Sequence, residues 1–222
     1  MIKVKPRAKI SAEFIDAYRS IVEARLEQED RKIRSLKGER RKAYLNQKKY
    51  VLGRLRAIAR KEALPGQGMD LEVTRLRALG FEQFAIASFE SRCFFGGITP
   101  EIVMEEVSRA NRLVARWDVG RFEAYIPIED VLSGETCRIH FIPTRERTTP
   151  YRHPHHVASP QGLNPLGFSP RTCWSDFGGP LTMALNECNI PELFRMFHIF
   201  ISRYYNGSPL TSSFTTHMRR LP

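Results

Sequence analysis

Residues 121–142 read RFEAYIPIEDVLSGETCRIHFI, and the pattern of apolar side chains in this stretch decides the fold class. Apolar and polar residues alternate over residues 121–128 and again over 136–142, which is the period of a strand with one buried face. Ser133 and Gly134 lie between the two runs and predict a turn that makes the strands antiparallel. The residues expected on the buried faces are Phe122, Ala124 and Ile126, and Cys137, Ile139 and Phe141.

The residues before this pair predict a helix and further strands. Thr99 precedes Pro100, an order typical of a helix N-cap followed by the first helical position. Residues 113–117 predict a strand that joins the following two in an antiparallel meander, and residues 84–95 are expected to contain another. The predicted helix would bury Ile102, Val103, Val107 and Ala110.

Two helices are expected after the pair, over residues 181–188 and 191–205. In the second, apolar side chains recur at spacings of three and four, and Pro191 stands in its first turn. Its expected buried residues are Leu193, Phe197, Phe200, Ile201 and Tyr204. The sequence therefore predicts an α+β fold: a small antiparallel sheet with flanking helices, preceded by a long basic helix or a helical hairpin.

The basic arm occupies the first third of the chain. Residues 11–63 contain no proline and are rich in strong helix formers, with Ser11 as the expected N-cap, and Gly38 could divide them into two antiparallel helices. Residues 1–65 hold 19 Lys and Arg against 8 Asp and Glu, whereas residues 66–222 hold 16 of each, so the whole excess of +11 lies in the arm. We predict that the arm binds nucleic acid or an acidic protein; a solvated helical face is the alternative. The candidate binding residues are Arg31, Lys32, Arg34, Lys37, Arg40, Arg41, Lys42, Lys48 and Lys49.

The boundaries follow from breaks in the helical pattern. Leu64-Pro65-Gly66 interrupts it, and a short helix is expected over residues 70–79. We predict a basic arm over 1–65, a connecting helix and strand over 66–98, and the main domain over 99–222.

The composition also excludes some classes of protein. No run of about 18 uncharged apolar residues could span a membrane, and the start MIKVKPRAKI lacks the apolar segment of a signal peptide. We therefore expect a cytoplasmic protein with no membrane partner. No phosphate-binding loop, serine triad or Cys-x-x-Cys spacing is present, and no cofactor is expected.

The candidate catalytic groups lie in residues 149–181, TPYRHPHHVASPQGLNPLGFSPRTCWSDFGGPL. Six prolines prevent regular pairing in this stretch, and long ordered loops in compact domains are usually functional. Cys173 could act as a nucleophile if a neighbour takes its proton, and His153, His155 or His156 could do so. The same four side chains could instead hold zinc, or cap and fill a surface loop.

The order of these elements resembles that of the ubiquitin-conjugating enzymes, in which strands are followed by a histidine-proline segment, a cysteine and helices. His153-Pro154-His155 followed by Cys173-Trp174 is similar to the His-Pro-His and Cys-Trp elements of the bacterial and phage branch of that fold. The resemblance covers roughly residues 100–210. It implies that Cys173 accepts a ubiquitin-like protein as a thioester from an activating enzyme, with His153 and His155 as catalytic groups, in a bacterial or phage-infected cell.

The sequence departs from this family pattern at two points. Twenty residues separate His153 from Cys173, a longer interval than in the family, and His155 stands where the eukaryotic signature has asparagine. A second interpretation is therefore a non-catalytic member of the same fold, an interaction module that joins the basic arm to another protein or to nucleic acid.

Overall fold

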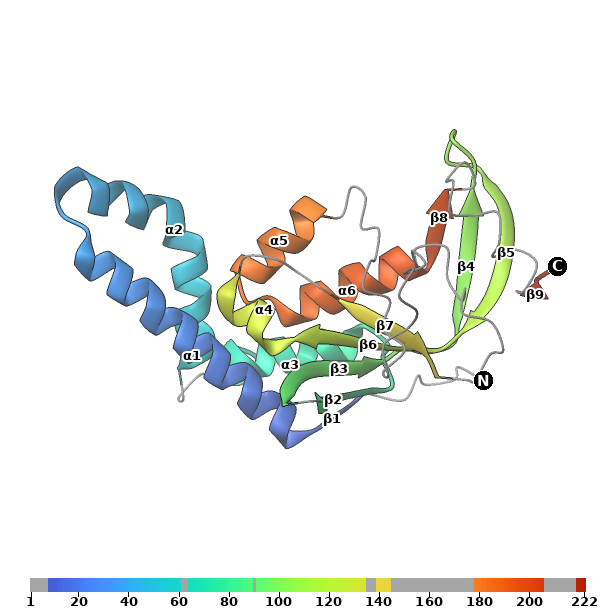
Figure 1. Cartoon of the computed structure of the whole chain (residues 1–222), viewed down its shortest axis with the longest axis horizontal. Helices are drawn as coiled ribbons and strands as arrows, with labels where there is room; N and C mark the ends of the chain where they lie inside the picture. The colour runs from blue at the N-terminus through green and yellow to red at the C-terminus, as the bar shows by residue number, and fades with distance from the viewer. Residues whose placement is uncertain (1–7, 61–63, 90, 135–138, 145–177, 206–218) are drawn as a thin grey trace.

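The computed structural model describes residues 8–60, 64–89, 91–134, 139–144, 178–205 and 219–222. These residues form two sheets and six helices, with a helical hairpin at one end of the molecule and the second sheet at the other (Figure 1). In chain order the elements are β1 (Lys9–Ile10), α1 (Ala12–Ser35), α2 (Gly38–Ala59), α3 (Gly68–Ala78), β2 (Gln83–Phe89), β3 (Arg92–Ile98), β4 (Ile102–Val107), β5 (Leu113–Gly120), β6 (Phe122–Pro127), α4 (Ile128–Ser133), β7 (His140–Pro143), α5 (Gly178–Asn186), α6 (Ile190–Ile201), β8 (Arg203–Tyr205) and β9 (Arg219–Arg220).

The main sheet has the strand order β1-β2-β3-β6-β7, and all its neighbouring strands are antiparallel except β1 and β2. One row of paired residues crosses it, with Phe84 beside Gly97, Gly97 beside Ala124 and Ala124 beside Phe141. Gly97 leaves room for Phe194 of α6, because a Cβ atom at position 97 would stand 2.8 Å from the Phe194 ring. This close approach seats α6 on the sheet.

The first helix packs into the same core. Ser11 caps α1 by accepting a hydrogen bond from the Phe14 amide at 3.2 Å, as expected. The ring of Phe14 is fully buried, with its centroid 4.9 Å from that of Phe95 and 5.7 Å from that of Phe84. The amino-terminal half of α1 is thus part of the core, although its sequence belongs to the basic arm.

The prediction of a helix beginning at Thr99 is wrong, because residues 102–107 form β4. Val103 is 46% exposed, whereas Ile102 and Met104 are buried, which is the alternation of a strand. Pairing with β5 overrides the N-cap pattern. Thr99 instead accepts a hydrogen bond from the Phe122 amide through its hydroxyl, at 2.9 Å, and so fastens the base of the β4–β5 hairpin.

The expected meander is present in part. β6 and β7 pair antiparallel, with Phe122, Ile139 and Phe141 on the buried face as predicted. The strand expected over residues 113–117 is β5, but it pairs with β4 and β9 in the second sheet instead of with β6. The neighbour of β6 on that side is β3. The β4–β5 hairpin is therefore an insertion between two neighbouring strands of the main sheet.

The carboxy-terminal helices are close to their expected positions. Asn189 caps α6 by accepting a hydrogen bond from the Glu192 amide, and Leu193, Phe197, Phe200 and Ile201 are buried as predicted. α6 ends at Ile201, so Tyr204, which was expected in this helix, belongs to β8. The described helices include none that is long and apolar enough to cross a membrane.

Candidate functional site

The basic arm is a helical hairpin that projects from the body of the protein (Figure 1). Leu36 and Lys37 connect the two helices, and α2 begins at Gly38, whose φ of +54° is a left-handed conformation that glycine adopts readily. Of the two arrangements that the sequence left open, the hairpin is the one observed.

Between the two helices lies a small polar cluster around Glu29. This carboxylate is nearly buried, accepts a hydrogen bond from the Tyr44 hydroxyl, and lies 3.6 Å from the Lys48 ammonium group. Burial and the Glu29 carboxylate raise the pKa of Tyr44 to about 12, while the Lys32 ammonium lies 5.0 Å from the centre of the Tyr44 ring. Two of the nine candidate binding residues thus also hold the hairpin together.

Two other candidates take part in exposed ion pairs along their own helix. Arg31 lies 3.3 Å from Glu27, and Lys42 lies 2.9 Å from Glu39. Exposed pairs of this kind contribute only about 0 to 1 kcal/mol. An anionic partner could therefore compete for both cations at little cost.

The remaining five candidates form the part of the arm with uncompensated charge. Arg34, Lys37, Arg40, Arg41 and Lys49 are exposed, and among the described residues no carboxylate lies within 4.0 Å of any of them. The first four lie around the connection between α1 and α2. We call these four residues the basic tip.

The backbone adds to the positive potential of the basic tip. Lys37 is the N-cap of α2 and makes no side-chain hydrogen bond to the first turn, so the amide groups that begin α2 receive no acceptor from their N-cap residue. The amino-terminal end of a helix carries a partial positive charge. Lys32 and Arg34 oppose the partial negative charge at the end of α1. The whole tip is therefore suited to anions.

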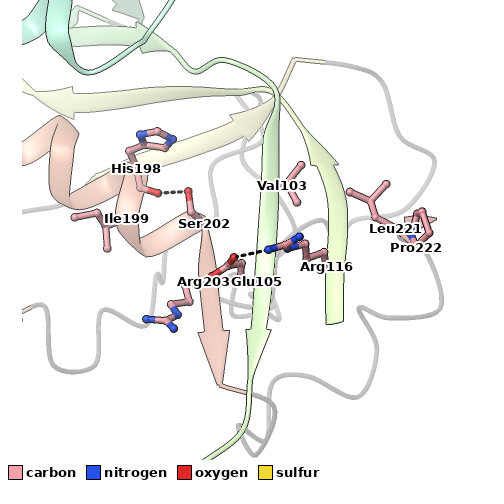
Figure 2. A pocket seen from close by; sticks show the side chains of 9 residues that line it. All are labelled: Val103, Glu105, Arg116, His198, Ile199, Ser202, Arg203, Leu221 and Pro222. Atoms are coloured by element: carbon pink, nitrogen blue, oxygen red, sulfur yellow. Dashed lines mark hydrogen bonds and ion pairs between the residues drawn. The ribbon is translucent and has the colours of Figure 1, made fainter. Parts of the chain in front are cut away.

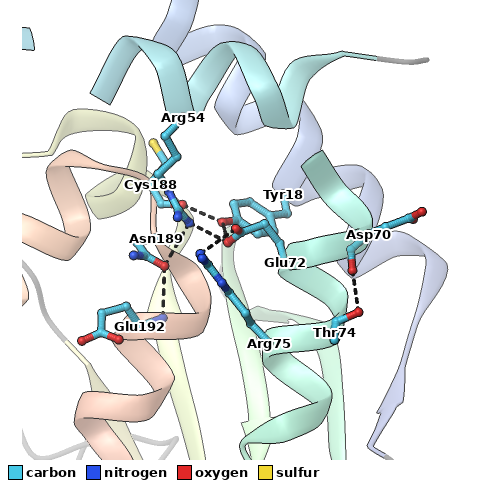
Figure 3. A network of polar contacts seen from close by, with 9 residues as sticks. All are labelled: Tyr18, Arg54, Asp70, Glu72, Thr74, Arg75, Cys188, Asn189 and Glu192. Atoms are coloured by element: carbon cyan, nitrogen blue, oxygen red, sulfur yellow. Dashed lines mark hydrogen bonds and ion pairs between the residues drawn. The ribbon is translucent and has the colours of Figure 1, made fainter. Parts of the chain in front are cut away.

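A buried network fixes the base of the hairpin to the body (Figure 3). Glu72 of α3 accepts hydrogen bonds from Arg54 of α2 at 2.5 Å and from Arg75 at 3.1 Å. The Tyr18 hydroxyl of α1 lies 2.9 Å from the same carboxylate and 2.8 Å from the Cys188 carbonyl, and burial raises the pKa of Tyr18. Arg54 also donates to Asn189, the N-cap of α6, at 3.0 Å. Side chains of α1, α2 and α3 thus meet at the Glu72 carboxylate, and the N-cap of α6 joins them through Arg54.

This network was not predicted from the sequence, although its two central residues left a signal there. Arg54 lies three residues after Val51 and four before Ile58, so it falls on the apolar stripe of α2. Glu72 lies three residues after Met69 and four before Leu76, so it falls on the apolar stripe of α3. Opposite charges placed on two apolar stripes indicate a buried pair.

The candidate catalytic residues Cys173, His153 and His155 lie outside the described residues, as do His156 and Cys137. The stretch that holds the catalytic candidates follows β7 and precedes α5. Two other cysteines are described: Cys93 is exposed, and Cys188 is buried. The part of the chain that the structure describes contains no group of three or more metal-ligating side chains.

An open cavity of about 870 Å³ lies between the end of α6 and the β4–β5 hairpin (Figure 2). Its charged side chains include Glu105 and Arg116, whose nearest atoms are 3.7 Å apart, and Arg203. Its other lining residues are Val103, His198, Ile199, Ser202, Leu221 and Pro222. The mixed lining suits a small amphipathic molecule, and the cavity lies at the opposite end of the molecule from the basic tip.

Comparison with known proteins gives no relative for this chain. No family model, no curated protein and no solved structure matches it. Arguments about its function therefore rest on its own residues and on the arrangement of its elements.

Proposed function

We propose that this protein is a ubiquitin-conjugating-enzyme-like protein that carries a ubiquitin-like modifier as a thioester on Cys173. One observation carries the proposal, which is the order of the elements along the chain. An antiparallel sheet ends at β7, the residues that include His153-Pro154-His155 and Cys173-Trp174 follow, and α5 and α6 come next. This is the order of strands, histidine-proline segment, cysteine and helices in the family that the sequence resembles.

The proposed reaction has two transfers. The Cys173 thiolate attacks the carboxy-terminal carbonyl of the modifier on its activating enzyme, so that a new C–S bond forms and the thiolate of the activating enzyme leaves. An acceptor amine then attacks the same carbonyl, Cys173 leaves as a thiolate, and the amine passes its proton to a base. His153 or His155 would accept protons in these steps. The partners are thus a ubiquitin-like protein and an activating enzyme.

The proposal is tested by the reactivity of Cys173 in the full chain. Labelling with iodoacetamide at a series of pH values, mapped by mass spectrometry, should modify Cys173 at lower pH than the exposed Cys93. Buried Cys188 serves as the control for an unreactive thiol. Replacing His153 or His155 with alanine should move the labelling of Cys173 to higher pH. A Cys173 that labels no earlier than Cys93 would count against a nucleophile.

A second experiment tests the thioester itself. A tagged chain expressed in its host should carry an adduct on Cys173 that a thiol reductant removes. In Cys173→Ser the oxygen ester should survive the reductant, and in Cys173→Ala no adduct should form. An adduct that persists in Cys173→Ala would place the attachment elsewhere.

The basic tip favours a second function, that of an interaction module without catalysis. In that case the hairpin binds an acidic protein or nucleic acid, and the main sheet serves as its support. Cys173→Ala would then leave function intact, whereas changing Lys and Arg to Glu within residues 31–49 would abolish it. The two functions predict opposite outcomes for the same pair of variants.

A further inference from the structure

We propose that the basic tip of the hairpin binds the phosphate backbone of nucleic acid. The inference rests on the proposal that the hairpin is a binding element, and it names the ligand. It does not depend on the chemistry of Cys173.

Positive charge is in large excess over a short length of the hairpin. Residues 31–49 hold nine Lys and Arg and a single acidic residue, Glu39, which is already paired with Lys42. The acidic residues nearer the base, Glu27, Glu29 and Asp30, pair with Arg31, Lys48 and Arg56. The acidic side chains of the hairpin therefore leave the basic tip uncompensated.

The basic tip presents hydrogen-bond donors of a kind that suits phosphate. Three of its four side chains are arginines, whose planar guanidinium groups match phosphate oxygens in pairs. The first amide groups of α2 point toward the same end of the hairpin and receive no capping hydrogen bond from the Lys37 side chain. Side chains and backbone thus offer hydrogen-bond donors to one anionic surface.

The composition of the hairpin surface favours nucleic acid over an acidic protein as the ligand. Protein interfaces have a core of apolar and aromatic side chains surrounded by a polar rim. All of residues 31–49 are described, and none of the exposed large apolar side chains falls among them. Tyr50, just beyond this range, is the nearest in sequence. A surface made of cations without an apolar centre suits a polymer with regularly repeated charge.

The network around Glu72 anchors the helix that carries part of the basic tip. Arg54 lies in the same helix as Arg40 and Arg41, and its contacts with Glu72 and Asn189 fix the far end of that helix to the body. Binding at the tip therefore requires no folding of the hairpin. Because the contacts are to phosphates, the binding should not depend on base sequence.

The test uses the full chain and a fluorescein-labelled DNA duplex of about 20 base pairs of mixed sequence, a length that exceeds the contacts expected here. Fluorescence anisotropy measures Kd as the KCl concentration is varied. Each phosphate contact contributes about 0.9 to the slope of log K against log salt, so the loss of two contacts weakens binding about 60-fold at 0.1 M salt. Arg40→Glu/Arg41→Glu should show that loss and a slope shallower by about 1.8.

Arg109→Glu/Arg112→Glu is the matched control, because these two exposed arginines lie at the β4–β5 turn, at the other end of the molecule. Both double variants lower the net charge of +11 by the same amount. The control should bind the duplex within threefold of the unaltered chain, and so should Cys173→Ser.

Equal losses in the two double variants would overturn the proposal, because they would show attraction by net charge alone. Failure to bind the duplex and a single-stranded RNA at low salt would overturn it as well. Displacement of the duplex by polyglutamate at equal charge concentration would assign the tip to acidic proteins. Loss of binding in Arg40→Glu/Arg41→Glu with Cys173 still reactive would separate this site from the thioester chemistry.

Discussion

Replacing Glu72 with glutamine should destabilise the fold strongly, because its carboxylate is buried and paired with a nearly buried arginine. Glu72 and Arg54 are 3% and 9% exposed at their side chains, and their nearest atoms are 2.5 Å apart. The substitution keeps the shape of the side chain and removes its charge. Arg54 would then be a buried cation without a counterion, and its contact with Asn189 alone cannot replace the carboxylate.

The expected magnitude follows from this burial. Breaking a buried ion pair by removing one partner costs about 3 to 5 kcal/mol, since the remaining charge stays desolvated. Glutamine can still accept a hydrogen bond, so we expect the lower end, about 3 kcal/mol. Stability of a domain is typically about 5 to 15 kcal/mol, so a large part of it would be lost.

Urea unfolding followed by circular dichroism measures the effect. Glu192→Gln provides the matched control, because Glu192 forms an exposed pair with Arg195 and its loss should cost less than about 1 kcal/mol. The double variant Arg54→Met/Glu72→Gln should be more stable than Glu72→Gln alone, because it removes the uncompensated cation.

Two results would refute this reasoning. One is a Glu72→Gln variant that unfolds at the same urea concentration as Glu192→Gln. The other is a double variant less stable than Glu72→Gln, which would mean that the Arg54 side chain stabilises the fold without its partner.

Three further variants test other contacts, all by urea unfolding. Gly97→Ala would place a Cβ atom 2.8 Å from the Phe194 ring and should cost about 1 to 3 kcal/mol; an unchanged midpoint would mean that α6 shifts freely. Thr99→Val would leave the buried Phe122 amide without its acceptor, for a loss of about 1 to 3 kcal/mol, and a neutral result would contradict the proposed fastening of the hairpin. Burial raises the pKa of the Cys188 thiol to about 11 from 9.0. The protonated thiol therefore contributes fully to the free energy of unfolding below pH 9, and this contribution is lost as the pH rises toward 11. In Cys188→Ala the free energy of unfolding should fall by about 2 to 3 kcal/mol less over this pH range than in the unaltered chain.

Part of the candidate surface could be predicted from the sequence because its properties are local. The nine basic residues of the arm lie within 19 positions of one another, so their charge is visible without knowledge of the fold. The hairpin was one of two arrangements that the sequence allowed. The exposure of the tip and the pairing of Lys48 with Glu29 depend on the contact between α1 and α2, which the sequence does not display.

The pairing of strands shows the same division. The alternation in β6 and β7 was visible in the sequence, because each strand buries one face and the period is two residues. The prediction of a helix at Thr99 was wrong because a local capping pattern competes with a partner strand, β5, and only five residues separate β4 from β5. Which sheet each strand joins was decided by contacts between segments that are distant in sequence.

The sequence by itself determined the fold class, the basic arm and most helix positions, since helical and strand periods, caps and charge runs are properties of neighbouring residues. Tertiary structure alone decided that the β4–β5 hairpin leaves the main sheet, that α1 enters the core, and that Arg54 meets Glu72. The physical reason is distance along the chain: Tyr18 and Cys188, which meet in that network, are 170 residues apart. A buried charge is tolerated only where such remote partners meet, and a local pattern can mark each charge on its apolar stripe without showing which distant residues it meets.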